Sequence, residues 1–148
     1  MLLNTMNLKR AIWVGILIYV VSFILRIIVT IILGLGIINL EINPTQTEIS
    51  NIYFFIYILI ILIITTLFTL YYFKDRKIKP SAKEGFFFGV ILIILGFILD
   101  IINFSILAAV SDSNQSTISH YSNPLFWLEL VLFLVVTTVI GAIKQKKK

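Results

Sequence analysis

The chain has 148 residues, of which 59% are hydrophobic and only 13% are charged, with a formal net charge of +5. Ordinary soluble domains are about half apolar and about a quarter charged, and a small domain keeps much of its surface in water. The composition therefore excludes a soluble domain, a disordered chain and a collagen-like fibre. It predicts a polytopic membrane protein.

Four continuous apolar stretches are long enough to cross a bilayer, because a spanning helix needs about 20 apolar residues. They cover approximately residues 11–34, 52–73, 85–110 and 124–143. We therefore expect an all-α fold, a four-transmembrane-helix bundle that forms one membrane domain over residues 1–148. Ser81 and Glu84 have the spacing of a capping box, and Pro124 suits the first position of the fourth helix.

Lysine and arginine predict the orientation, since cytoplasmic loops of membrane proteins are rich in these residues. They precede the first span, separate the second from the third and end the chain, whereas residues 35–51 and 111–123 contain none. Both termini and the middle loop should face the cytoplasm, in a multi-pass protein of the cell membrane. Because the basic residues flank apolar segments, we expect the lipid bilayer as a partner and no nucleic acid.

The two halves of the chain resemble each other over residues 9–74 and 83–146. KRAIWVGILIYVVSFILRII at residues 9–28 aligns with KEGFFFGVILIILGFILDII at residues 83–102, and Ser-Asn and Thr-Thr pairs recur at a shift of 72. The alignment predicts a duplicated two-helix hairpin whose two units enter the membrane with the same polarity. The alternative is that two unrelated hairpins converged on the same membrane composition.

Three ionisable residues, Arg26, Asp100 and Glu129, lie inside the predicted spans. Counting about 1.5 Å per residue from the ends of the apolar stretches places all three in one layer of the outer leaflet. Charges in a membrane usually face the bundle interior and pair, so we expect Arg26 to bridge Asp100, Glu129 or both. Tyr57, the repeat equivalent of Glu129, and Asn103, on the face of Asp100, are expected to join this network.

The predicted layer has three interpretations. It is a structural ion pair that fixes helix register, or a polar site that binds a substrate, an ion or a proton. In the third interpretation, the charged groups contact lipid headgroups near the outer surface.

Small residues on the predicted inward faces should let helices approach closely, as is common in membrane bundles. They lie in the first and third spans: Gly15, Ser22, Gly85, Gly89 and Gly96. We therefore expect these two helices to pack against each other.

The residues that usually carry chemistry are scarce. The chain has no cysteine and one histidine, which excludes disulfide scaffolds, thiolate zinc sites and iron–sulfur clusters. Hydrolase, zinc-protease, P-loop and dinucleotide-binding motifs are missing from the sequence. We therefore predict that the protein is not an enzyme, with no catalytic residue, no metal site and no cofactor.

The segments KRAIWVGILIYVVSF and EGFFFG…ILD resemble small four-span membrane proteins of bacteria and archaea whose function is unknown. This resemblance implies a prokaryotic inner-membrane protein and carries over no functional residues. The sequence favours a non-enzymatic membrane component that acts through helix association, as a homo-oligomer or as a subunit of a membrane complex. The alternative is a small transporter or channel with Arg26, Asp100 and Glu129 as its polar site.

Overall fold

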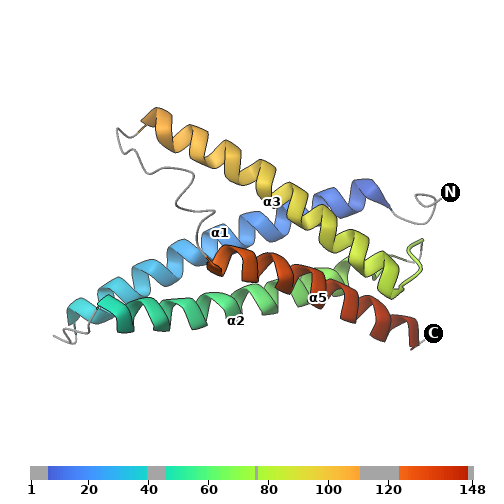
Figure 1. Ribbon diagram of the computed structural model, residues 1–148, viewed down its shortest axis with the longest axis horizontal. Coiled ribbons are helices and arrows are strands. Elements are labelled where there is room, and N and C mark those ends of the chain that lie inside the picture. The colour runs from blue at the N-terminus through green and yellow to red at the C-terminus, as the bar shows by residue number, and fades with distance from the viewer. Residues whose placement is uncertain (1–6, 40–45, 76, 111–123, 147–148) are drawn as a thin grey trace.

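The computed structural model describes residues 7–39, 46–75, 77–110 and 124–146. Within these ranges, side chains are not described for Arg26 or for residues 33–39, 46–54, 104, 107–110 and 124–125. The described chain forms four helices and no strand: α1 (Leu8–Asn39), α2 (Gln46–Tyr72), α3 (Ala82–Val110) and α5 (Pro124–Lys146) (Figure 1). The all-α fold expected from the sequence is confirmed.

Polar side chains cap the helix starts that lie nearest the lysine-rich segments. The Oδ1 atom of Asn7 accepts the backbone N–H of Arg10 at 3.1 Å, and the Oγ atom of Ser81 accepts that of Glu84 at 3.0 Å. Each bond satisfies one of the N–H groups that a helix start leaves without a partner. Pro124 is the first residue of α5, the position that tolerates its missing N–H.

Each predicted span coincides with one helix, apart from Phe73, which lies one residue beyond α2, and the largest boundary differences are at the end of α1 and the start of α2. α1 stays helical through Gly34 and Gly36 to Asn39, and α2 begins at Gln46 instead of near residue 52. The extension of α2 consists mostly of polar residues, at positions 46–51, whereas the extension of α1, at positions 35–39, is mostly apolar.

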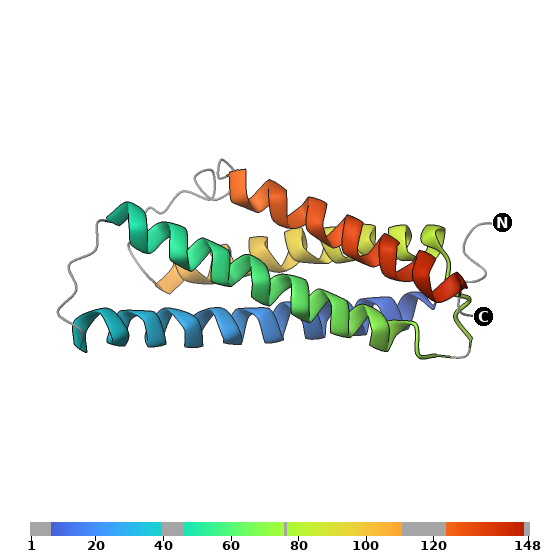
Figure 2. The same cartoon turned by 90° about the horizontal axis from the view of Figure 1, so that it is seen from below.

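The helices form an elongated bundle in which consecutive helices run antiparallel (Figures 1 and 2). α1 contacts α2 and α3, α5 contacts the same two helices, and the contact between α3 and α5 is the most extensive. The expectation that the first and third helices pack against each other is confirmed. Figure 1 also shows that α1 and α3 cross and then diverge towards the end of the bundle opposite the chain termini.

The buried core lies in the half of the bundle where α1 and α3 begin. It combines Val14 and Ile18 of α1 with Tyr72 at the end of α2 and Phe88 and Leu92 of α3, all at most 4% exposed. The aromatic rings of Tyr72 and Phe88 stack with centroids 4.2 Å apart. This end is therefore the firmly packed part of the molecule.

Each helix contains a window that is long and apolar enough to cross a membrane, with a mean hydropathy between 2.3 and 2.7. At most 28% of the residues in any of these windows are buried inside the chain. Large side chains such as Phe55, Ile106 and Ile32 are more than half exposed. Such apolar surface is unfavourable in water by about 25 cal/mol per Å² and is accommodated by lipid tails. These features indicate a membrane protein with four helices that are long and apolar enough to span a bilayer.

Candidate polar site in the membrane-spanning bundle

Asp100 on α3 faces Tyr19 on α1. The hydroxyl of Tyr19 donates a hydrogen bond to Oδ1 of Asp100 over 3.0 Å, and both side chains are half-buried. One turn earlier on α1, a Cβ atom on Gly15 would lie 2.6 Å from Cδ1 of Leu95. This close approach of α1 to α3 sets the register that places Tyr19 opposite the carboxylate.

Glu129 on α5 faces Tyr57 on α2. The Tyr57 hydroxyl donates to Oε2 of Glu129 over 3.2 Å, and both side chains are again half-buried. These two residues are the ones that the internal alignment made equivalent at a shift of 72. In both pairs the tyrosine belongs to the first hairpin and the acid to the second, so each hydrogen bond joins the two halves of the chain.

Two members of the predicted network are not placed in it. Arg26 belongs to α1, seven residues or about 10 Å of helix rise beyond Tyr19, and its side chain lies outside the described residues. Asn103 is half-buried on α3, and the described part of the chain gives it no hydrogen bond. The bridge from Arg26 to Asp100 or Glu129 stays a prediction.

Asp100 and Glu129 each follow, on antiparallel helices, one of two phenylalanines whose rings meet. The rings of Phe97 on α3 and Phe126 on α5 meet with centroids 5.4 Å apart, which fixes the register of these antiparallel helices. Asp100 follows Phe97 by three residues in one direction, and Glu129 follows Phe126 by three residues in the other. The two acids therefore lie on opposite sides of this ring contact. The prediction that Arg26, Asp100 and Glu129 share one depth in the membrane stays a prediction.

A third tyrosine–carboxylate pair, which the sequence did not predict, lies near the lysine-rich end. The Tyr72 hydroxyl donates to Oε1 of Glu84 over 2.8 Å, and the exposed fractions are 0% for Tyr72 and 5% for Glu84. Sequence reasoning assigned Glu84 to a capping box with Ser81. The backbone half of that box is present, whereas the described contact of the carboxylate is Tyr72. A carboxylate one turn into a spanning helix was the feature that could have identified this pair.

Two threonines continue the buried face of α2 from Tyr72. Thr65 and Thr69 are at most 1% exposed, and their hydroxyls find no hydrogen-bond partner among the described residues. The spacing of Thr65, Thr69 and Tyr72 places them on one helical stripe. The interior of the bundle therefore carries hydroxyl groups as well as apolar side chains.

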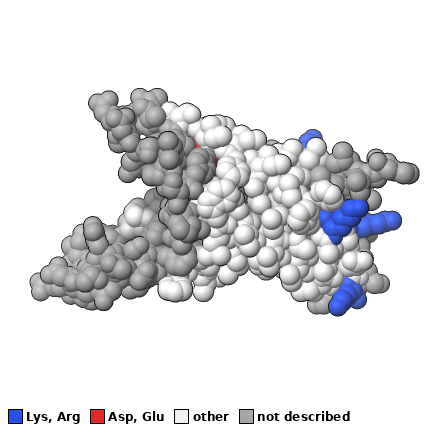
Figure 3. All heavy atoms as spheres, viewed as in Figure 1, with Lys and Arg blue, Asp and Glu red and all other residues white. Residues whose placement is uncertain are grey.

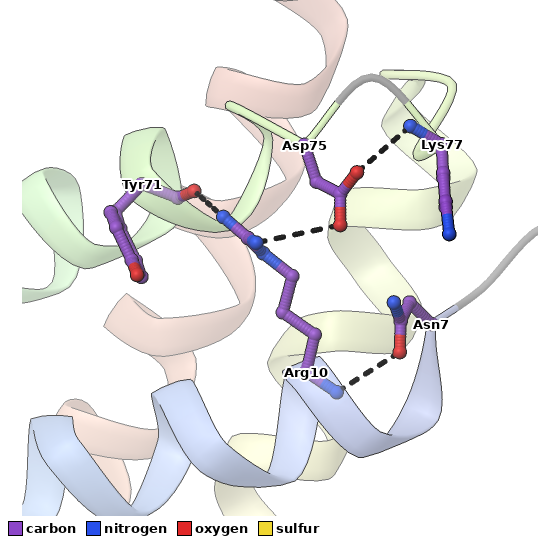
Figure 4. A network of polar contacts seen from close by, with 5 residues as sticks. All are labelled: Asn7, Arg10, Tyr71, Asp75 and Lys77. Atoms are coloured by element: carbon purple, nitrogen blue, oxygen red, sulfur yellow. Dashed lines mark hydrogen bonds and ion pairs between the residues drawn. The ribbon is translucent and has the colours of Figure 1, made fainter.

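Arg10 joins the start of α1 to the end of α2 (Figure 4). Its NH2 group donates to the backbone oxygen of Tyr71 at 2.7 Å, its NH1 group lies 3.4 Å from Oδ2 of Asp75, and its Cζ atom is 4.9 Å from the centre of the Tyr71 ring. The carbonyl of Tyr71 lies at the end of α2 and also accepts the backbone N–H of Lys74 at 3.1 Å. Sequence reasoning treated Arg10 only as a marker of orientation, since the residues it joins are 61 and 65 positions away.

Glycines produce the closest contact in the bundle, between α3 and α5. A Cβ atom on Gly85 would overlap the carbonyl oxygen of Thr137, and one on Gly89 would lie 2.6 Å from the Thr137 hydroxyl oxygen. The Thr137 hydroxyl itself donates to the carbonyl of Phe133 at 2.7 Å. The predicted role of Gly85 and Gly89 in close packing therefore agrees with the geometry, although their partner is α5 and not α1.

The other predicted packing residues differ among themselves. Gly15 contacts Leu92 and Leu95 of α3, as expected. A Cβ on Gly96 would meet no described atom within 4 Å, so Gly96 does not form a close helix contact there. Ser22 is half-buried, and its hydroxyl has no partner in the described ranges.

The described residues contain no group of three or more histidine, cysteine, aspartate or glutamate side chains that could hold a metal ion. Comparison with protein-family models, with curated proteins and with solved structures yields no match. The resemblance to small four-span membrane proteins therefore stays an expectation from the sequence.

Proposed function

We propose that this protein is a small, non-enzymatic transporter or channel for a cation, and that Asp100 and Glu129 bind the cation. The observation that carries the proposal is the pair of carboxylates inside spanning helices, each held by a tyrosine hydroxyl across the boundary between the two hairpins. Relative movement of the hairpins would change both sites at once.

The charge balance of the membrane interior supports cation binding. A tyrosine hydroxyl orients a carboxylate but does not neutralise it, and an intramembrane charge costs at least about 2.5–3.5 kcal/mol near the bilayer centre. The interior of the spans carries one arginine, Arg26, against Asp100 and Glu129. Acidic side chains therefore outnumber arginine in these parts of the spans, which favours a cation over an anion as the ligand.

Flux through reconstituted vesicles tests this proposal. Wild type, Asp100→Asn and Glu129→Gln are compared for proton, sodium, potassium and small organic cation flux. Asp75→Asn is the matched control, because it removes a carboxylate at the lysine-rich end. We expect at least one cation to pass through wild type and the control and to be slowed in both site variants. Equal fluxes in all four proteins would contradict the proposal.

For the orientation, we propose that the lysine-rich end faces the cytoplasm of a prokaryotic cell. Figure 3 shows the described lysine and arginine side chains gathered at the end of the bundle where the chain begins and ends. Positive loops are retained on the cytoplasmic side during insertion, which supports this placement.

Helix association, the function that the sequence alone favoured, is the second candidate. Gly15, Gly85 and Gly89 already pack against helices of the same chain, so they are not available for contacts with another protein. This weakens the case for helix association. Gly96 is the specific observation in its favour, because a neighbouring helix could approach α3 at this open position. Crosslinking in native membranes tests it: a wild-type homo-oligomer or complex that Gly96→Leu abolishes would support association, and a monomer without partners would contradict it.

A further inference from the structure

The tight contact between α3 and α5 brings two lysine-bearing segments together. A Cβ atom on Gly141 would overlap the carbonyl oxygen of Ser81 and lie 3.3 Å from the Cα atom of Gly85. The start of α3 and the end of α5 therefore touch backbone to backbone. Lysines lie on both sides of this contact, before and after Ser81 and after Gly141: Lys77, Lys79, Lys83, Lys144 and Lys146.

These five residues, named here the lysine cluster, are not offset by the described acids at this end. Asp75 pairs with Arg10, and the buried Glu84 accepts a hydrogen bond from Tyr72. The cluster is exposed except for Lys144, which is half-buried, and Figure 3 shows described lysine and arginine side chains in several groups at this end of the bundle. Like charges held together by the backbone contact repel one another, and an anion with more than one negative charge would relieve this repulsion.

Apolar side chains beside the lysine cluster indicate what kind of anion fits. Phe86 and Phe87 follow Lys83 and are 47% and 37% exposed, and Ile143, 50% exposed, precedes Lys144. A lipid bound here would place its phosphates among the lysines and its acyl chains against these exposed side chains. A soluble phosphate would contact the lysines but not these apolar side chains.

We propose that the lysine cluster is a binding site for a polyanionic phospholipid headgroup in the adjoining leaflet. General orientation signals do not require this arrangement, because lysines on separate loops serve orientation equally well. Lys144 and Lys146 also interact favourably with the carbonyl end of α5, but Lys79 and Lys83 lie at the start of α3, where the helix dipole adds positive potential. A bound anion would therefore relieve the most unfavourable electrostatic energy at Lys79 and Lys83.

Two double variants test the site. Lys83→Gln with Lys144→Gln removes two charges from the lysine cluster, and Lys9→Gln with Lys74→Gln removes two exposed charges from the ends of α1 and α2. The proteins are placed in phosphatidylcholine discs with increasing amounts of cardiolipin, and retained cardiolipin is counted by native mass spectrometry. Circular dichroism verifies that each variant is folded.

We expect the cluster variant to bind cardiolipin roughly 25-fold more weakly than wild type, from about fivefold per lysine near a membrane surface. The control variant should lose clearly less. Equal losses in the two variants would show attraction by net charge alone and would overturn the proposal, as would no loss in either. Inorganic phosphate that displaces cardiolipin at comparable concentration would also overturn it, because a soluble anion would then be the ligand.

Discussion

Replacing Gly85 by alanine tests the packing of the bundle at its closest contact. The added methyl group would lie 2.8 Å from the carbonyl carbon of Thr137 and 3.0 Å from the Cα atom of Thr138. Carbon atoms in ordinary contact are about 3.5–4.0 Å apart, so the helices would have to separate by roughly 0.7 Å or more. The obstructing atoms belong to the backbone and cannot rotate away. Overpacking of this kind costs about 1–3 kcal/mol.

Gly96→Ala is the matched control on the same helix, because its methyl group meets no described atom within 4 Å. Both substitutions gain the same intrinsic helix preference, about 1 kcal/mol, so their difference isolates the packing cost. We expect Gly85→Ala to unfold at a lower denaturant fraction in mixed lipid–detergent micelles, with a free energy of unfolding about 1–3 kcal/mol below that of Gly96→Ala. Equal free energies in the two variants would refute the α3–α5 contact described here.

Three further substitutions probe the polar contacts, each measured as a free energy of unfolding in the same micelles. Arg10→Ala should lower the free energy of unfolding by about 1–2 kcal/mol, because it removes the charged hydrogen bond and the contact with the Tyr71 ring. Lys9→Ala, at an exposed position, should have little effect. Equal effects of the two substitutions would argue against the contacts between Arg10 and the end of α2. Tyr72→Phe should cost about 1–3 kcal/mol because it leaves a buried carboxylate without its donor, and a neutral result would argue against that hydrogen bond. Arg26→Leu should destabilise, and Arg26→Leu combined with Asp100→Leu should recover part of the loss if these residues pair; additive losses would exclude pairing.

The number and approximate length of the helices could be predicted from the sequence. A long apolar segment in lipid must satisfy its backbone hydrogen bonds internally, which an α-helix does. The starts of α3 and α5 could also be predicted, because Ser81 and Pro124 act on their own helix and need no tertiary partner. Helix ends extended by polar residues, such as the start of α2 at Gln46, lie outside what hydropathy detects.

Contacts between helices could be predicted only in part. The internal alignment makes Tyr57 and Glu129 equivalent and predicts that they lie at a similar depth. The two side chains form a hydrogen bond in the structure. The partner of Asp100 was not foreseen, because the Tyr19 contact depends on how α1 and α3 cross. The difference between Gly85 and Gly96 is likewise tertiary, since both are glycines on one helix and only one of them meets α5.

Cysteine labelling tests the central claim, that four helices cross a membrane with the lysine-rich end in the cytoplasm. The native chain has no cysteine, so single variants report without background. Thr47→Cys marks the start of α2, Lys77→Cys follows its end, and Ile63→Cys lies mid-helix at a side chain that is 50% exposed.

A membrane-impermeant maleimide is added to intact cells and then to lysed cells. Thr47→Cys should react in intact cells, Lys77→Cys only after lysis, and Ile63→Cys in neither case, because lipid covers its exposed surface. Labelling of Ile63→Cys as fast as Lys77→Cys in lysed cells, or labelling of Thr47→Cys and Lys77→Cys from the same side, would contradict the claim.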